Sequence, residues 1–432
     1  MIFRSNRNFR RHELNNGTLW LAGYIDRPLG ELNYRFADHD VLDLKGQFGL
    51  VWQGHDGWWL AQCDHLCTYP LWYRHTTEEV FSHWCNVKGN DNDWDEIFFA
   101  QRDILHGQMT VGTRTPIKDI ERVQPDHCLD AGTQMRYRWS LDVLWEGPTD
   151  WHDRLLEAVK RNCEHGDVLM LSGGRDSTTI ACVAKHLGIE LDYVHITRGK
   201  TNPDTESCKE FAQELGIHVR YLDPWEEELD WEEHYYWHDS SYAPKRQCLQ
   251  MLGKTRGVSG ELGASESGSK KINTILQRPD ITIEQLTNIW ITTLERRDEA
   301  TASPLVHDDY TEWAEHNYFY ATAYKEIIEH HEQMYEHYKS LTDETDQLLK
   351  AVVMLHQQDH EAYRLHNYSQ DKELTWKHPF SHPAWFDIVW NAPLEKRKLN
   401  HHNREIYRIA TEGCDWFKDT AWKYGGPRGL TQ

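Results

Sequence analysis

Residues 168–187 read VLMLSGGRDSTTIACVAKHL and combine three local signals. Residues 168–171 form a short apolar run, which is typical of a buried strand in a parallel sheet. Ser172, Gly173 and Gly174 follow at once, and the two glycines predict a tight turn. Residues 177–187 then carry an apolar face at helical spacing. The order strand, glycine turn, helix predicts a unit of an α/β fold.

The turn between this strand and this helix has the composition of a phosphate-binding loop. Gly173 and Gly174 let backbone N–H groups approach a ligand, and the N-terminus of the following helix adds partial positive charge. The GxxxxGK[ST] pattern of the Walker loop is absent. Two glycines alone would fit a turn without a ligand, but Ser172, Asp176 and Ser177 beside them favour a phosphate site.

The pattern Ser-Gly-Gly-x-Asp-Ser at 172–177 resembles the pyrophosphate loop of the N-type ATP pyrophosphatases. The resemblance implies that ATP is split into AMP and pyrophosphate and that an acyl or imidoyl adenylate is formed. It further implies that the loop, starting at Leu171, binds ATP and that Asp176 holds Mg²⁺.

The segment after this loop alternates between strand and helix signals: 191–197 (LDYVHIT) as a strand, 205–215 as a helix and 218–222 as a strand. This alternation predicts a parallel sheet wound right-handed. In the resembling family the end of the second strand lines the adenine pocket, which implies that Ile196 and Thr197 lie near the base. Asp204 and Glu206 match an acidic pair of that family, or are solvated acids at a helix start.

Composition limits the possible classes of function. The chain has 432 residues, which suits about two or three domains. Its net charge of −22 argues against broad contact with a nucleic-acid backbone. The nine cysteines include no CxxC pair, so reduced thiols in a cytoplasmic protein are expected. No stretch approaches the length of a membrane span, and no apolar segment of a signal peptide follows the basic N-terminus.

Residues 1–146 are expected to form a first, α+β domain with antiparallel sheets. Apolar or aromatic runs at 47–51 and 58–63 flank Asp56-Gly57, which predicts a hairpin. The stretch GQFGLVWQGHDGWWLAQCDHLCTYPLWY (46–73) is similar to the glutaminase domain of asparagine synthetases. The resemblance implies an Ntn-hydrolase-like αββα fold of the class II glutamine amidotransferase type. The positions that match the family are Gly46, Phe48, Asp64, Pro70, Leu71 and Tyr73.

Departures from that family determine the chemistry expected of the first domain. Such glutaminases use a cysteine directly after the initiator Met as the nucleophile, with its own α-amine as base. Position 2 is Ile2, Ala22 replaces the asparagine that holds glutamine, and Cys67 replaces a glycine. Neither Cys63 nor Cys67 has a free α-amine. We therefore expect a degenerate glutaminase domain; a working glutaminase with another nucleophile is the alternative.

Residues 147–432 are expected to form a synthetase domain, an adenine nucleotide α-hydrolase-like (HUP-type) parallel-sheet fold with a helical C-terminal part. Residues 256–271 (RGVSGELGASESGSKK) resemble the Ser-Gly-Glu segment of asparagine synthetases. Ser259, Gly260 and Glu261 match it, which implies ATP binding by the first two. The metal-binding aspartate of the family is missing, so Glu266, or alternatively Ser265, takes its place. A flexible Gly/Ser surface loop is the competing interpretation.

The C-terminal part carries two further matches. Residues 378–393 (HPFSHPAWFDIVWNAP) resemble the family segment Pro-Phe-Leu-Asp, with His382 where the family has aspartate. Lys423 falls on the lysine that contacts the phosphates and the transition state in the family. Lys418 is the second choice, and a solvated C-terminal lysine is the alternative. Before these matches, helices are expected within 309–337 and 348–365.

Together these features predict an ATP-dependent amide-forming ligase of the asparagine synthetase superfamily that does not use glutamine. A carboxylate would attack ATP in the presence of Mg²⁺, and Lys423 would stabilise the phosphate charge. Glu261 would accept the proton of the attacking amine. The expected substrates are a small-molecule or peptide carboxylate, with aspartate leading, and ammonia or an amine. A homodimer is possible.

Two other functions stay open at the level of the sequence. One is an intramolecular amide cyclase like the β-lactam synthetases, which have a degenerate glutaminase domain, or the lasso-peptide cyclases. β-Lactam synthetases carry Tyr at the position of Glu261, so Glu261 favours asparagine-synthetase chemistry. The other is a catalytically inactive nucleotide-binding or regulatory protein, suggested by the irregular segment after Gly260.

Overall fold

The structure is a computed structural model, and it describes residues 1–84, 93–105, 110–136, 150–197, 203–224, 242–261, 282, 284, 285, 287, 318–339, 365, 368, 373–391 and 410–417. Contacts within the chain divide it into two compact units. The predicted border near residue 146 lies outside the described residues and stays a prediction. None of the described helices combines the length and apolar composition that a membrane crossing requires.

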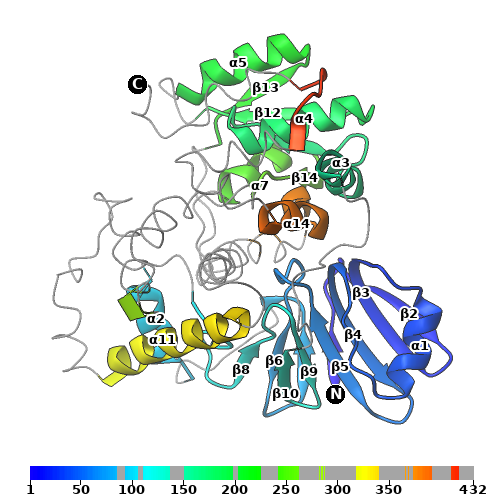
Figure 1. The fold of residues 1–432 in the computed structure, drawn as a ribbon, viewed down its shortest axis with the longest axis vertical. Coiled ribbons are helices and arrows are strands. Elements are labelled where there is room, and N and C mark those ends of the chain that lie inside the picture. Colours follow the sequence, from blue (N-terminus) through cyan, green and yellow to red (C-terminus); the bar gives the residue numbers. More distant parts are fainter. Residues whose placement is uncertain are drawn as a thin grey trace. The chain divides into compact units, whose positions relative to one another are not determined.

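The first unit contains a six-stranded antiparallel sheet (Figure 1). In sheet order its strands are β10 (Thr133–Arg136), β9 (His127–Asp130), β5 (Trp59–Cys63), β4 (Gly46–Gly54), β3 (Gly17–Ile25) and β2 (Arg10–Leu14). The predicted hairpin is confirmed, because β4 and β5 pair antiparallel across Asp56 and Gly57. Gly57 has a φ of 93° there, a conformation that favours glycine.

A second, four-stranded sheet follows the order β1 (Ile2–Arg4), β7 (Glu79–Phe81), β6 (Trp72–Arg74) and β8 (Ile120–Arg122). β1 runs parallel to β7, whereas the other pairs are antiparallel. Side chains from both sheets share one buried core, which includes Val51 and Ala61 of the larger sheet and Tyr73 and Val80 of the smaller one. Helix α1 (Leu29–Ala37) buries Leu32 and Phe36 in a separate core on the larger sheet.

Helix α11 (Tyr318–Lys339) belongs to the same unit and packs on α2 (Glu96–Ile104), as Figure 1 shows in yellow and cyan. The predicted helix of 95–105 is confirmed, and Asp95 caps it by accepting from the backbone of Ile97 at 3.0 Å. The sequence placed α11 in the second domain, whereas its contacts group it with the N-terminal sheets.

The second unit contains a five-stranded parallel sheet. In sheet order its strands are β13 (Val219–Leu222), β12 (Asp192–Ile196), β11 (Val168–Met170), β14 (Arg256–Val258) and β15 (Thr375–Lys377). All neighbouring strands pair in parallel, which confirms the alternation of strand and helix expected after residue 168. The helices of this unit are α3 (Trp151–Asn162), α4 (Arg175–His186), α5 (Pro203–Leu215), α7 (Tyr242–Met251) and α14 (Pro383–Asn391).

The strand order reverses direction at β11. From β11 the chain proceeds outward through β12 and β13, and it then returns to the other side of β11 with β14 and β15. In open parallel sheets such a reversal leaves a crevice beyond the carboxyl ends of the two central strands, where ligands bind. The loops that follow β11 and β14 therefore lie at the position where this fold class places its ligand.

The opposite, amino-terminal edge of the sheet is held by charged groups. Arg256 at the start of β14 contacts Asp167 just before β11, with 2.7 Å between Nε and Oδ1. Asp167 is fully buried, and this burial raises the pKa of its carboxyl. On the helical side, Arg154 of α3 pairs with the buried Asp387 of α14. The first pair joins β14 to the residue before β11 at the amino-terminal edge, and the second joins two helices of this unit.

The fold is thus mixed α/β, with one antiparallel and one mixed sheet in the first unit and a parallel sheet in the second. This level of the predicted fold class is confirmed. The core of the parallel sheet joins Val168 and Met170 of β11 to Cys248 and Leu249 of α7. The assignments to Ntn-hydrolase-like and HUP-type architectures stay predictions.

Candidate functional site

The turn after β11 is built around Gly173. This glycine has a φ of 77°, and a Cβ there would lie 3.1 Å from both the carbonyl oxygen of Asp204 and the backbone nitrogen of Cys208. The turn therefore needs glycine both for its backbone conformation and for its close approach to α5. The sequence predicted a glycine turn whose backbone could approach a ligand, and the structure adds the positive φ of Gly173 and its packing on α5.

Hydroxyl groups stabilise the same turn. Ser172 Oγ accepts a hydrogen bond from the Gly174 backbone at 3.1 Å and lies 3.1 Å from Ser177 Oγ. Ser177 Oγ also accepts from the Ser172 backbone at 3.1 Å. The serines at both ends of the motif thus bond to each other across the glycines, which shapes the loop without a ligand.

Helix α4 begins directly at this loop. Gly174 is its N-cap and has no side chain, so no capping side chain accepts a hydrogen bond at the positive end of the helix. Asp176 stands in the first turn and is half-buried. Backbone N–H groups at such a helix start attract anions, and a carboxylate beside them can hold a cation that neutralises phosphate.

A buried histidine ties the loop to β12 and α5. His195 Nδ1 lies 2.8 Å from the carbonyl oxygen of Leu171, and Nε2 lies 3.0 Å from Thr205 Oγ1. Since a carbonyl only accepts, Nδ1 carries the proton and Nε2 accepts from the threonine. Burial lowers the pKa of His195, which favours this neutral form. Beyond it, Ile196 and Thr197 are half-buried at the carboxyl end of β12.

The Ser-Gly-Glu segment reaches the glycine loop in space. Ser259 is buried, and its backbone donates to the carbonyl of Lys377 at 3.0 Å, which extends the pairing of β14 and β15. A Cβ on Gly260 would lie 3.1 Å from Asp176 Cβ and from the Ser177 backbone nitrogen. The two motifs lie more than 80 positions apart in the sequence, from Ser177 to Ser259. They are nevertheless in direct contact at the reversal point of the sheet.

Glu261 does not stand alone at this edge. Lys245 of α7 forms an ion pair with Glu261 Oε1, and the same ammonium donates to the Tyr368 hydroxyl at 2.6 Å. The Tyr368 hydroxyl in turn donates to Glu261 Oε1 at 3.1 Å. Only 14% of the Lys245 side chain and 15% of the Glu261 side chain are exposed. We call these three residues the Lys245 cluster.

Aromatic rings enclose the Lys245 cluster. Tyr242 and Trp376 pack edge-to-face on Tyr368, with centroids 4.9 and 5.1 Å away. The Lys245 ammonium lies 5.2 Å from the Tyr368 ring centroid, within cation–π range. His378, directly after β15, lies 4.8 Å from the same ring, and burial lowers its pKa to about 3. The charges of the cluster therefore face each other in a largely dry environment.

Sequence reasoning found Glu261 but missed Lys245 and Tyr368. Lys245 is 16 positions before Glu261, and Tyr368 is 107 positions after it. No motif spacing connects residues so far apart. The only local signal is that Lys245 lies in the helix preceding β14, whose carboxyl end carries Glu261.

His382 stands where the resembling family has aspartate, and the structure places it in the core at the start of α14. It is fully buried, and its Nδ1 accepts a hydrogen bond from the Ala384 backbone at 3.1 Å, at the start of α14. Burial lowers its pKa to about 3, so the ring is neutral. Glu206 of the expected acidic pair is exposed and paired with Lys209 at 2.6 Å, which favours the solvated interpretation.

Four predicted site residues lie outside the described residues. They are Ser265, Glu266, Lys418 and Lys423. The second metal ligand and the C-terminal lysine therefore stay predictions. Leu171, Ser172, Gly173, Gly174, Asp176, Ser177, Ile196, Thr197, Ser259, Gly260 and Glu261 all lie in the second unit, in or directly beyond the carboxyl ends of its parallel strands.

Three positions of the first unit, Ile2, Ala22 and Cys67, depart from the glutaminase family that the sequence resembles. Cys67 has a φ of 49°, the left-handed conformation that explains why the family has glycine at this position. Its thiol donates to the carbonyl of Val123 at 3.3 Å, and burial raises the thiol pKa well above its usual value. Ala22 is fully buried, while Ile2 at the start of β1 is 58% exposed. No reactive thiolate is therefore favoured at Cys67, and the degenerate glutaminase domain stays a prediction.

Asp64 has a structural position in that segment. Its carboxylate accepts from the backbones of Phe48 at 2.7 Å, Leu66 at 2.8 Å and Thr68 at 3.2 Å. Burial raises its pKa to about 6 despite these donors. The carboxylate thus fixes the turn after β5, which accounts for an aspartate at this matching position.

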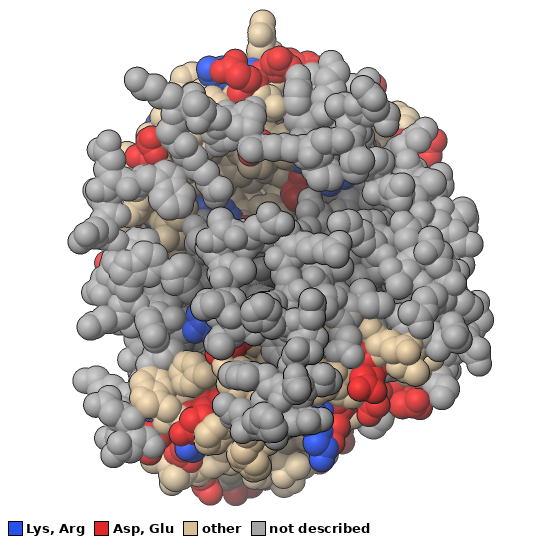
Figure 2. Space-filling view, turned by 90° about the vertical axis from the view of Figure 1, so that its left-hand side faces the viewer, with Lys and Arg blue, Asp and Glu red and all other residues tan. Residues whose placement is uncertain are grey.

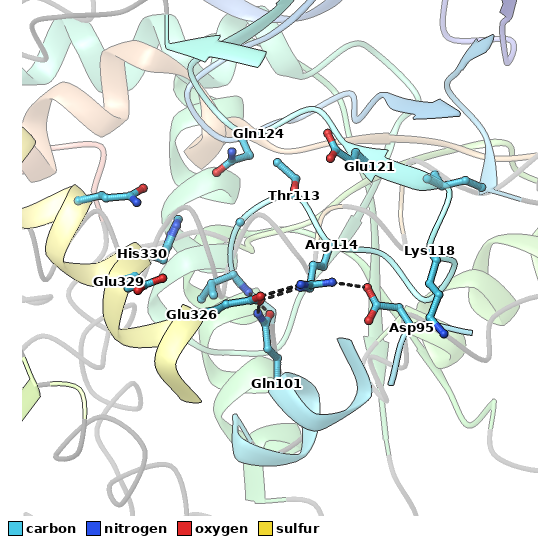
Figure 3. Close-up of a pocket in the computed structure, with 14 residues that line it drawn as sticks. Asp95, Gln101, Thr113, Arg114, Lys118, Glu121, Gln124, Glu326, Glu329 and His330 are labelled. Carbon is cyan, nitrogen blue, oxygen red and sulfur yellow. Dashed lines mark hydrogen bonds and ion pairs between the residues drawn. The ribbon is translucent and has the colours of Figure 1, made fainter. Parts of the chain in front are cut away.

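A cavity of about 360 Å³ lies in the first unit, between α11 and the segment 111–124 (Figure 3). Its main cation is Arg114, which binds Glu326 through Nε at 2.7 Å and NH2 at 2.6 Å. NH1 binds Asp95 at 2.7 Å. Because carboxylates already occupy all three nitrogens, this guanidinium joins α11 to the N-terminal sheets and is not presented to an anion.

The charge distribution is mixed on the described surface. Figure 2 shows acidic side chains interspersed with isolated lysines and arginines over the described part of this face. This pattern agrees with the net charge of −22. The expectation that nucleic acid is not a partner stays a prediction.

Comparison with known proteins gives a local similarity. No family model matches the chain. A stretch of 56 residues, 13% of the chain, is 38% identical to 7-cyano-7-deazaguanine synthase from Methanospirillum hungatei. The match spans 24% of that protein's length. The chain is thus similar to one part of that synthase.

Proposed function

We propose that the chain is an ATP-dependent carbon–nitrogen ligase of the asparagine synthetase type that works without glutaminase activity. It would activate a small-molecule or peptide carboxylate as an acyl adenylate, and ammonia or an amine would then attack it. One observation carries the proposal: Gly260 of the Ser-Gly-Glu segment packs against Asp176 and Ser177 at the reversal point of the parallel sheet. This contact between the two motifs supports their assignment to one site.

The local similarity to 7-cyano-7-deazaguanine synthase supports this proposal in broad terms. It favours a synthase or ligase that uses ATP, and it does not distinguish the asparagine synthetase type from others. The finer assignment rests on Glu261 and on the order of motifs in the sequence.

The described residues have distinct parts in the proposed reaction. The backbone of 172–177 and the start of α4 would bind the pyrophosphate portion of ATP. Asp176 is suited to Mg²⁺, which binds proteins through one or two carboxylates together with substrate phosphates. When bound, the ion would neutralise charge on the phosphates. Ile196 and Thr197 would face the adenine, and Glu261 would take the proton of the amine.

Exchange of labelled pyrophosphate into ATP tests the adenylation step. Purified protein would be incubated with ATP, Mg²⁺ and a panel of carboxylates led by aspartate, and Asp176→Asn would be the matched control. We expect exchange that depends on one class of carboxylate and is lost in the control. Release of an internal amide from a single substrate, without added ammonia or amine, would indicate a cyclase. If the protein binds ATP but exchanges no pyrophosphate with any carboxylate, the ligase proposal is contradicted. That result would favour an inactive nucleotide-binding protein.

A further inference from the structure

The ion pair of the Lys245 cluster is costly to maintain as a structural contact. Both side chains are largely buried, since only 14% of the Lys245 side chain and 15% of the Glu261 side chain are exposed. Desolvation of two charges cancels much of their attraction, so a pair of this kind adds little net stability to a fold. Its position at the carboxyl edge of the sheet suggests a role in binding or chemistry.

The cluster lies next to the proposed phosphate site. Glu261 directly follows Gly260, which contacts the first turn of α4 at Asp176 and Ser177. The described acids near this edge, Asp176 and Asp204 among them, repel a polyanion. Mg²⁺ at Asp176 would offset part of that repulsion, and Lys245 brings a further cation on a flexible four-carbon stem that can reorient a compact charge.

We propose that Lys245 exchanges partners when nucleotide binds: its ammonium leaves Glu261 for the phosphates of ATP, and Glu261 is thereby released to accept the proton of the attacking amine. This inference rests on the proposed function, because it assigns a binding residue and a coupling to the same site. Tyr368 remains beside Glu261 and continues to orient the carboxylate through its hydroxyl.

The exchange would order the two chemical steps. An ammonium in contact with a carboxylate stabilises the charged form and weakens it as a proton acceptor. Glu261 is therefore a poor base while Lys245 holds it, and it improves once the ammonium has moved to phosphate. The amine would thus lose its proton at Glu261 only in a site that already contains nucleotide.

The proposal makes opposite predictions for the two ends of one ion pair. Lys245→Met removes the cation and should weaken ATP binding by about 10- to 100-fold, the range of a charge-assisted hydrogen bond. Glu261→Gln removes the competing carboxylate and should leave ATP binding equal or tighter, because Lys245 no longer has to leave a charged partner. A merely structural pair would give losses of the same sign in both variants.

The experiment measures affinity for ATP with Mg²⁺ by calorimetry, with adenosine as a probe that lacks phosphate. Variants are Lys245→Met, Glu261→Gln, the double variant, and Lys245→Arg, which keeps the charge. The double variant removes both charges at similar shape and therefore controls for the uncompensated Glu261 left by Lys245→Met. We expect Lys245→Met and the double variant to lose ATP affinity and to keep adenosine affinity. Lys245→Arg, which keeps the charge, should lose less ATP affinity than Lys245→Met.

Three outcomes would overturn the partner exchange. They are unchanged ATP affinity in Lys245→Met, equal weakening by Glu261→Gln, and parallel loss of adenosine binding. Pyrophosphate exchange by the native protein separates this result from the proposed function. If the native protein exchanges pyrophosphate while Lys245→Met binds ATP normally, the ligase stands and the Lys245 proposal falls. If the native protein binds no ATP, both fall.

Discussion

Alanine at Gly173 should destabilise the region around β11 and α4, whereas alanine at the neighbouring Gly174 should do so less. Gly173 has a φ of 77°, which costs an alanine about 1–2 kcal/mol. Its new Cβ would meet backbone atoms of α5 at 3.1 Å. Neither helix can move without disturbing its packing, and such crowding costs about 1–3 kcal/mol.

A compensating effect reduces this loss. Alanine restricts the unfolded chain more than glycine does, which stabilises the folded state by about 0.4–1 kcal/mol. The net destabilisation expected for Gly173→Ala is therefore about 1–5 kcal/mol. Gly174 has an ordinary φ of −78°, and a Cβ there would contact only the rotatable Ser172 Oγ at 3.1 Å. For Gly174→Ala, which places a poorer N-cap at α4, we expect a smaller loss of about 0.5 kcal/mol.

Amide hydrogen exchange in the middle of α4 is the suitable assay. A chain with two compact units need not unfold in one step, so a local measurement is more informative than a single global transition. Amides of residues 180–184 should lose protection in Gly173→Ala, and they should keep most of it in Gly174→Ala. Equal protection in the two variants would refute the steric account of the loop.

Arg114→Met should release α11 from α2 and destabilise the first unit by about 2 kcal/mol, because two partly buried carboxylates lose their cation. The control is Lys118→Met, which breaks an exposed ion pair. In the same urea titration it should change stability by less than about 1 kcal/mol. Iodoacetamide at pH 8 should modify the half-buried Cys414 before Cys67, because burial raises the pKa of the Cys67 thiol. Peptide mass spectrometry measures the order of modification, and earlier reaction of Cys67 would contradict the prediction. The pKa of His382 falls from 6.5 to about 3 on folding, so the unfolded state binds more protons between these values and stability should decline as the pH falls below 6.5. His382→Asn keeps an acceptor for the backbone and should flatten this acid slope in urea titrations at pH 5 to 7; an unchanged slope would contradict the role of this histidine.

Local features of the fold were predictable because short-range physics determines them. The apolar run before two glycines identified β11 and the start of α4, and Asp56-Gly57 identified the hairpin of β4 and β5. Each signal depends on backbone conformations within a few residues. The alternation of strands and helices after residue 168 likewise predicted a parallel sheet, since parallel neighbours need a crossover connection.

Long-range contacts were not predictable in the same way. The sequence separates Arg114 from Glu326 by 212 positions, yet their ion pair joins α11 to the N-terminal sheets. His382 occupies a place where a resembling family has aspartate, but its role follows from burial at the start of α14. Residue type alone does not determine either environment.

By itself, the sequence determined a glycine turn between a buried strand and a helix, because only glycine tolerates the left-handed conformation of residue 173 beside a neighbouring helix. It also identified Glu261 as a candidate group of the site. Only the tertiary structure decided what Glu261 faces. The parallel sheet brings Lys245 and Tyr368 to its carboxyl edge from 16 and 107 positions away, and the chemistry of a carboxylate depends on the charges that folding places around it.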